Sequence, residues 1–325
     1  MLTGAAPDVL RVDALAKRFA GGGGVVDVSM RLVAGAVTGF IGVNGAGKST
    51  TLRCILGLLS PDAGRIEMFG APADRDARRR VGFLPEERGL FPRERARDVI
   101  AFHARLKGLD KRAAFHAADR LLERIGLAER RRARVGELSK GNAQRVQLLC
   151  ALAHGPDLLI LDEPFSGLDP IAQGEVHSLF SEFRAGGGAI LFSTHAMAAA
   201  ESLCDQVVIL AGGRTVFEGA VAEAAAASPH GAVVVTSDDG GLARAVAAVG
   251  GALTPMASRM GEAARWRVTL PPEVTHPALM RALADLGVPI FAFEPIKSDL
   301  EGAFWRLAAE ARPVETVPAE ARRVA

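Results

Sequence analysis

Residues Gly42 to Ser49 of this 325-residue chain fit the pattern G-x-x-x-x-G-K-[ST] at every fixed position. Glycines there let the backbone turn its N–H groups toward a phosphate, and a helix beginning at this point adds partial positive charge. Lys48 would reach the β- and γ-phosphates of a nucleotide, and the Ser49 hydroxyl would join the shell of a bridging Mg²⁺ ion. These residue types and their spacing therefore predict a loop that binds nucleotide phosphates.

The residues on either side of this loop supply the strand and the helix that its chemistry requires. Residues 36–41 form an apolar run that predicts a strand, and residues 49–59 contain few breakers and predict a helix. Further along, residues 158–161 are all apolar and are followed by Asp162 and Glu163. Because runs that are apolar on both faces suit the centre of a parallel sheet, we expect two carboxylates at the end of a buried strand.

Strands and helices alternate along the first two thirds of the chain, which indicates an open α/β sheet with ligand groups at strand ends. From residue 95 to about residue 126 the apolar spacing is three and four, which predicts a helical insertion. Ser139 is placed to cap the helix that follows it. Further strands are predicted at residues 9–14, 25–33, 65–69, 81–84, 189–193, 206–210 and 214–217, with a helix at 174–184.

The last third of the chain reads as a separate small α+β domain. After an alanine-rich helix at residues 220–227 the predicted order is strand, helix, two strands, helix and strand, which is a ferredoxin-like arrangement. A final helix is expected at residues 299–310. The expected boundaries are a first domain at 1–222 with a helical subdomain at about 86–155, a linker at 223–231, the small domain at 232–311 and a disordered tail at 312–325.

Composition narrows the class of protein. No apolar run is long enough to cross a bilayer, and the N-terminus lacks an export signal, so we expect a soluble cytoplasmic chain. The three cysteines are far apart, which argues against zinc and disulfide frameworks. The net charge of +2 gives no reason to expect a nucleic-acid partner. The short basic runs at 78–80 and 130–134 fit a solvated surface or, alternatively, contact with anionic lipid heads.

Five segments in a fixed order resemble the family of ABC-type ATPases over roughly residues 9–220. They are the loop at 42–49, LSKGN at 138–142, LLILDEP at 158–164, SGLD at 166–169 and STH at 193–195. The resemblance implies a P-loop fold with a mostly parallel core sheet, an antiparallel N-terminal β subdomain and a helical subdomain. Within this family, the chain resembles bacterial exporter subunits of the sodium- and drug-efflux type. Three features carry this narrower resemblance: the stretch LPEERGLFP at 84–92, the SKGN variant and the added C-terminal domain.

The resemblance implies that ATP and Mg²⁺ are bound. In the family pattern Glu163 would orient or deprotonate the attacking water, His195 would contact the γ-phosphate, and Lys48 completes the catalytic set. The two adjacent carboxylates could instead cap the turn that follows them. Mg²⁺ would be held by Ser49, Glu86 and Asp162. The expected ATP contacts are Phe19 (in the adenine-stacking place), Asn44, Gly45, Ala46, Gly47, Lys48, Ser49 and Thr50.

The same resemblance implies a head-to-tail dimer, homomeric or heteromeric, with two ATP molecules in its interface. Residues expected to reach ATP bound by the other subunit are Ser139, Lys140, Gly141, Asn142 and Asp169. Two positions depart from the common pattern. Lys140 replaces a glycine and adds a charge, and Glu86 stands where many relatives have glutamine, so it is expected to tune turnover without abolishing it.

The leading hypothesis is therefore an ATPase subunit, peripheral on the inner face of the cell membrane, that powers a separate membrane permease through residues 86–100. A non-transport ABC ATPase in translation or DNA repair is the alternative, although zinc sites, strong basic patches and a second ATPase unit are missing from this sequence. A monomeric P-loop kinase would lack the LSKGN and SGLD pair. The C-terminal domain is open to two interpretations, a ligand-binding regulator or a dimer-stabilising unit.

Overall fold

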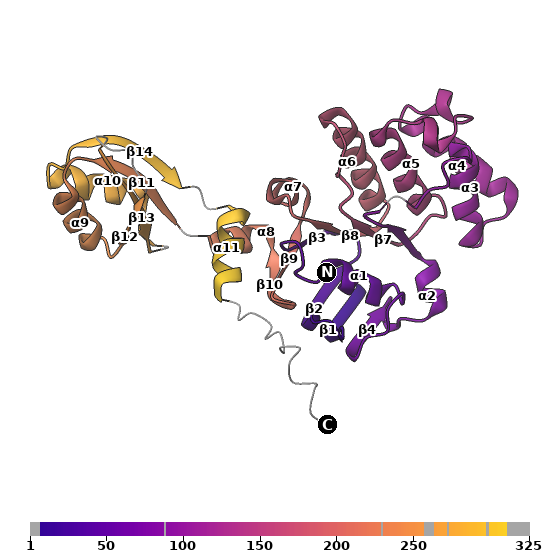
Figure 1. The fold of residues 1–325 in the computed structure, drawn as a ribbon, viewed down its shortest axis with the longest axis horizontal. Helices are drawn as coiled ribbons and strands as arrows, with labels where there is room; N and C mark the ends of the chain where they lie inside the picture. Colours follow the sequence, from indigo (N-terminus) through magenta and orange to yellow (C-terminus); the bar gives the residue numbers. More distant parts are fainter. Residues whose placement is uncertain are drawn as a thin grey trace, which may run out of the picture. The chain divides into compact units, whose positions relative to one another are not determined.

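The computed structural model describes residues 7–87, 89–228, 230–256, 263–271, 273–296 and 299–310. The chain forms two compact units (Figure 1). Of the described residues, one unit contains those up to Val221 together with Leu307–Glu310, and the other contains those within Ala222–Arg306. None of the described helices is long and apolar enough to cross a membrane. The tail predicted as disordered, 312–325, lies outside the described residues.

The first unit is built on a sheet with the strand order β5-β4-β1-β2-β10-β9-β3-β8-β7-β6. Strands β9, β3, β8, β7 and β6 are parallel, whereas β1, β2, β4 and β5 form an antiparallel extension, as expected from the sequence. The strands are β1 (Asp8–Arg18), β2 (Gly24–Val33), β3 (Val37–Ile41), β4 (Ala63–Met68), β5 (Ala71–Pro72), β6 (Val81–Leu84), β7 (Leu158–Asp162), β8 (Ala189–Thr194), β9 (Gln206–Ala211) and β10 (Arg214–Ala220).

The three central strands β3, β8 and β7 are buried at every residue. Alternate residues of β7 enter different apolar clusters: Leu159 and Leu161 pack on the side of the helical subdomain, and Ile160 packs on the side of α1 and β1. Both faces of the strand are therefore covered, which is why its first four residues, 158–161, are all apolar. Polar chemistry is therefore confined to the carboxyl ends of these strands, as at Asp162 and Ser193, and to the residues that follow them.

Helices cover both faces of this sheet, and α3, α4 and α5 pack against one another as the predicted helical insertion (Figure 1). Ser139 caps α5 as predicted, since its hydroxyl accepts the N–H of Asn142 at 3.2 Å. The helix after the phosphate loop was expected to reach residue 59 but ends at Ile55, before Gly57. The short helices α2 and α7 were not expected. The helices of this unit are α1 (Lys48–Ile55), α2 (Arg75–Arg79), α3 (Ala96–Leu106), α4 (Lys111–Arg124), α5 (Lys140–Leu152), α6 (Pro170–Ala185) and α7 (Met197–Leu203), with 3₁₀ turns at Ala128–Arg130 and Val135–Glu137. Helix α8 (Val221–Ala226) begins at the last residue of this stretch and continues into the second unit.

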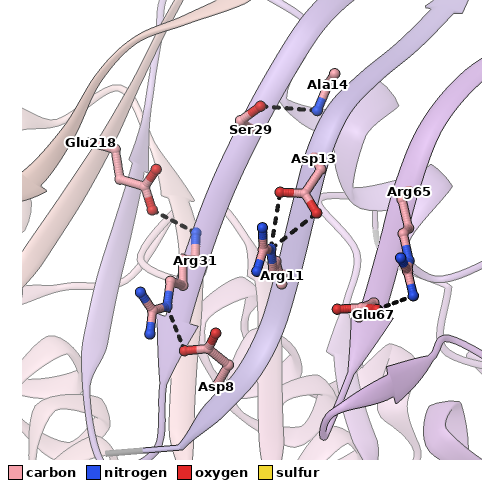
Figure 2. Close-up of polar contacts among 9 residues, drawn as sticks. All are labelled: Asp8, Arg11, Asp13, Ala14, Ser29, Arg31, Arg65, Glu67 and Glu218. Atoms are coloured by element: carbon pink, nitrogen blue, oxygen red, sulfur yellow. Dashed lines mark hydrogen bonds and ion pairs between the residues drawn. The ribbon is translucent and has the colours of Figure 1, made fainter. Parts of the chain in front are cut away.

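Side chains join the antiparallel extension to the parallel core where the strand ladder is short. Strands β2 and β10 share one paired position, Arg214 with Asp27. Beside it the Glu218 carboxylate accepts the backbone N–H of Arg31 at 2.6 Å, and the Thr215 hydroxyl bonds both backbone groups of Ser29 (Figure 2 shows the glutamate). Burial raises the pKa of Glu218, and the bond from Arg31 opposes that shift. These two side chains replace ladder bonds and keep the sheet continuous.

The arginines at this junction are also balanced in charge. Arg11 on β1 lies directly opposite Arg31 on β2, an arrangement that would be destabilising on its own. Each has an acidic neighbour: Arg31 pairs with Asp8 at 2.6 Å, and Arg11 pairs with Asp13 at 3.0 Å (Figure 2). The exposed face of the extension is therefore a solvated ladder of opposite charges.

The second unit confirms the predicted ferredoxin-like order. Its strands pair antiparallel in the order β12-β13-β11-β14, and its two helices α9 and α10 share one apolar cluster with the sheet. The helix predicted at residues 220–227 is confirmed as α8, and β11 begins at His230, within the range 223–231 that was predicted as a linker. The elements are β11 (His230–Thr236), α9 (Asp239–Ala248), β12 (Ala252–Met256), β13 (Ala264–Leu270), α10 (His276–Asp285) and β14 (Ile290–Ile296), followed by α11 (Leu300–Glu310).

Candidate functional site

A cavity of about 420 Å³ lies where β3, β6 and β7 end. These are the carboxyl ends of parallel strands, where open α/β sheets place their ligands. The cavity is lined by Gly24, Val43, Asn44, Gly45, Gly47, Lys48, Ser49, Thr50, Glu86, Asp162 and Glu163. The fold thus brings most of the residues predicted for ATP and Mg²⁺ together in one place.

The loop between β3 and α1 has the conformation that phosphate binding requires. Gly47 has φ +106, and a Cβ built there would lie 2.3 Å from a Val25 methyl carbon, so only glycine fits. Helix α1 begins at the next residue, Lys48. The first N–H groups of a helix have no partner within it, so those of α1 are available to an anion in the cavity.

Lys48 is nearly buried, with 7% of its surface exposed. Its ammonium donates to the carbonyl of Gly42 at 2.6 Å, which holds the side chain along the loop. Burial lowers the pKa of Lys48, and the carboxylates of Glu163, Asp162 and Glu86 oppose that shift. The lysine therefore lies among three acids, and a bound phosphate would give this cation a second anionic partner.

The oxygen atoms of Ser49 and Asp162 are adjacent and suit a magnesium ion. The Ser49 hydroxyl donates to Oδ2 of Asp162 at 2.9 Å, across the space between α1 and β7. Mg²⁺ prefers oxygen ligands and usually binds through one or two carboxylates together with phosphate oxygens and water. Glu86 lines the same cavity from the loop after β6, so it could supply a further oxygen. The donor set fits the predicted ion.

Glu163 is fixed by contacts from β8 and from His195. Its N–H bonds the Ser193 hydroxyl at 3.1 Å, and its carboxylate Oε1 lies 2.8 Å from Nδ1 of His195. Glu163 also has φ +51, a left-handed conformation that is unfavourable for a residue with a side chain. The imidazole is 66% exposed whereas the glutamate side chain is 12% exposed, and His195 contacts Glu163 without being among the residues that line the cavity.

The residues predicted to act on ATP of another subunit lie together but outside this cavity. A Cβ on Gly141 would be 3.7 Å from the carbonyl of Gly167, so the SKGN segment lies beside the SGLD turn. Asp169 caps α6 by accepting the N–H of Ala172 at 2.9 Å. The lining of the cavity includes neither Ser139 nor Asp169. Within one chain, the two groups of predicted residues therefore stay separate.

Two residues predicted to contact ATP, Phe19 and Ala46, are not among those that line the cavity. Phe19 is 43% exposed at the end of β1, and Ala46 is buried within the phosphate loop. Sequence reasoning missed Gly24, Val43 and Ser193. The run of four glycines that ends at Gly24 was a usable signal, and Val43 is inside the motif itself.

Comparisons with known proteins agree with this geometry. A family model described as "ABC transporter" matches residues 25–166. The ABC transporter ATP-binding protein YhaQ of Bacillus subtilis, itself described as uncharacterized, is 40% identical over 231 residues, covering 71% of this chain and 78% of that protein. The Nod factor export ATP-binding protein I of Burkholderia lata is 41% identical over 207 residues, covering 63% of this chain and 68% of that protein.

Solved structures give the same result. One described as an ATP-binding subunit of an ABC transporter has a TM-score of 0.62 and 33% identity, covering 66% of this chain and 91% of that chain. CbiO1 of Clostridium perfringens, part of the transporter complex CbiONQ, has a TM-score of 0.59 and 29% identity, covering 66% and 89%. The chain belongs to the family of ABC transporter ATP-binding proteins. It is an ATP-binding subunit with an added ferredoxin-like domain.

Proposed function

We propose that this chain hydrolyses ATP with Mg²⁺ and that two ATPase subunits close on two ATP molecules to drive a separate membrane permease. Lys48, Ser49 and Asp162 hold the phosphates and the ion. Glu163 orients or deprotonates the attacking water, and His195 contacts the γ-phosphate beside it. Hydrolysis then releases the dimer, and this cycle of closure and opening is what the permease uses.

The arrangement of Glu163 is the observation that carries this proposal. Its carboxylate is at the mouth of the phosphate cavity, in contact with His195 and next to the Asp162–Ser49 pair. A general base must lie within hydrogen-bond reach of the water that it activates, and only a nucleotide phosphate on α1 would bring such a water here.

Export is the direction of transport that we propose. Two observations support it: the Nod factor export ATP-binding proteins are similar to this chain over more than half of its length, and LPEERGLFP with SKGN resembles efflux subunits. The protein would then work at the inner face of the cell membrane, held there by its permease through residues 86–100. The wild-type protein should hydrolyse ATP when its permease is present, and a rate near zero would contradict the proposal.

Replacing Glu163 by Gln tests the assignment of the base. The amide keeps the shape of the side chain but cannot take a proton, so we expect kcat to fall by at least ~100-fold. ATP should then hold the variant as a stable dimer, measured as an ATP-dependent change of mass in solution. The matched control is Glu129→Gln, which changes an exposed glutamate in the 3₁₀ turn of the helical subdomain and should leave the rate unchanged. Hydrolysis by Glu163→Gln near the wild-type rate would overturn this role.

A further inference from the structure

Gln147 is a buried amide in the middle of α5. It is 4% exposed and lies between Val146 and Leu148, which are both buried. Its Nε2 donates to two backbone carbonyls, that of Pro85 at 3.2 Å and that of Glu87 at 3.2 Å. Its Oε1 is buried without a partner among the described residues. Because an apolar side chain of this size would avoid that desolvation cost, the two donated bonds are the evident reason for an amide here.

The two carbonyls belong to the residues on either side of Glu86. The loop that they form follows β6, and Glu86 is the residue whose carboxylate lines the phosphate cavity. Glu86 is also close enough to Lys48 to oppose the lowering of its pKa by burial. Two bonds that flank a single residue fix the direction in which its side chain leaves the backbone. Gln147 therefore orients a cavity carboxylate that it does not itself touch.

Helix α5 can serve as a firm base for this contact because it packs directly on β6. A Cβ on Gly82 would lie 2.2 Å from the carbonyl oxygen of Ala151, so helix and strand are in backbone contact at this point. Ala151 is four residues after Gln147 and therefore on the same face of α5. The N-terminal end of the same helix carries Ser139, the first residue of the SKGN segment. One helix thus connects that segment to the loop of Glu86.

We propose that Gln147 is a positioning residue that holds Glu86 at the metal side of the phosphate cavity and makes the 85–87 loop move with α5. The proposal rests on the proposed function, because it takes this cavity to bind ATP with Mg²⁺, and Glu86 lines the cavity together with Ser49 and Asp162. In addition, α5 and Gln147 would couple the SKGN segment, which is predicted to contact the partner's ATP, to the metal site of the same chain. The coupling needs no contact between Gln147 and either ligand.

The test is a double-mutant cycle between Gln147→Met and Glu86→Ala in the Glu163→Gln background, which prevents hydrolysis during the titration. Binding of ATP is measured by calorimetry at increasing Mg²⁺ concentrations and again in EDTA. We expect Gln147→Met to raise the Mg²⁺ concentration at half-saturation by about 10-fold, the size typical of losing a residue that orients a metal ligand. Affinity in EDTA should not change. In the Glu86→Ala background the same substitution should have no further effect.

Two further variants distinguish a loss of positioning from a general loss of stability. Gln147→Asn keeps the amide but shortens the side chain by one methylene, so it should weaken Mg²⁺ dependence even if the methionine variant fails to fold. Thr236→Val is the matched control, since it removes another buried bond to a backbone carbonyl, 2.7 Å to Pro289 in the second unit. It should lower the thermal midpoint without altering the Mg²⁺ titration.

Three outcomes would overturn the role of Gln147. They are an equal loss of affinity in EDTA, a shift of the same size with and without Glu86, and a normal Mg²⁺ titration for both Gln147 variants. These results are distinguishable from failure of the proposed function, because in that case the protein with an unaltered Gln147 would itself show no Mg²⁺-dependent binding of ATP.

Discussion

Ser193 connects the two carboxylates that follow β7. It is fully buried, its hydroxyl contacts Oδ1 of Asp162, and it accepts the N–H of Glu163. With one oxygen of Asp162 engaged in this way, the other is directed to Ser49 and the cavity. The left-handed backbone of Glu163 costs roughly 1–2 kcal/mol and needs such contacts to persist. The Ser193 hydroxyl therefore positions both Asp162 and Glu163.

Replacing Ser193 by Ala should lower the free energy of unfolding by about 2 kcal/mol, because a hydrogen bond to a buried carboxylate is lost. The rate of ATP hydrolysis should fall as well, since neither Asp162 nor Glu163 would keep its orientation. Denaturant titration and a steady-state ATPase assay measure the two effects. Ser193→Thr keeps the hydroxyl and serves as the control. An alanine variant with unchanged stability and rate would show that the hydroxyl has no such role.

At this scale, the residues found from sequence are those that form linear motifs. Gly47, Lys48 and Ser49 are consecutive, so the loop pattern determines their relation without knowledge of the fold. Ser193 belongs to the STH motif, but its contacts with Asp162 and Glu163 depend on the pairing of β7 with β8, which a single sequence does not contain. Gly24 likewise reaches the site through the folding of β2, and its only signal in the sequence was the glycine run that ends there. Gln147 was hidden for a different reason, because a glutamine within a mostly apolar helix has no characteristic spacing.

Among the elements, the packing contact between α5 and β6 (the α5–β6 joint) attaches the helical subdomain to the core sheet. The helix and strand meet at Gly82, and Lys107 at the end of α3 adds bonds to the carbonyls of Arg78 at 2.9 Å and Val81 at 2.8 Å. The subdomain is thus tied to β6 from two helices. Movement of α5 must be passed to β6 and the loop beyond it.

A Gly82→Ala substitution tests this joint. The added methyl would be 2.2 Å from the Ala151 carbonyl oxygen, so α5 must shift or the core must expand. Overpacking of this kind costs about 1–3 kcal/mol of unfolding free energy. We expect a lower thermal midpoint together with a weaker Mg²⁺ dependence of ATP binding, since the Glu86 loop would shift with the helix. Gly240→Ala is the control, because a Cβ there would meet only side-chain atoms outside the backbone of its own helix, at 3.7 Å or more. A loss of stability with a normal Mg²⁺ dependence of ATP binding would contradict this, because it would show that the packing of α5 on β6 does not affect the Glu86 loop.

Element prediction succeeded where the apolar pattern was long and strong. β3, β7 and β8 are apolar on both faces, and the βαββαβ order of the second unit follows from alternating patterns that the fold confirms. The errors have local causes. Helix α1 was extended past Ile55 because Leu56 to Leu59 continue an apolar run, and α2 and α7 are too short to show a period.

For the whole molecule, the main feature is that one chain holds two separate groups of the residues predicted to act on ATP. The cavity contains the phosphate loop, Asp162 and Glu163, whereas the SKGN segment and the SGLD turn lie beside each other elsewhere in the first unit. A head-to-tail pair of chains would bring the first group of one subunit to the second group of the other. Efficient hydrolysis is therefore expected to need a second copy of this chain or a close relative.

Mixing two inactive variants tests that claim most directly. Lys48→Ala removes the phosphate-binding cation, and Gly141→Asp adds a negative charge where the partner's γ-phosphate would bind, at a position with room for a Cβ. Each variant alone should be inactive. An equal mixture should recover about a quarter of the wild-type ATPase rate, because half of the random pairs contain one intact composite site of two. A mixture that stays as inactive as its components, although the two variants still associate, would contradict the composite site.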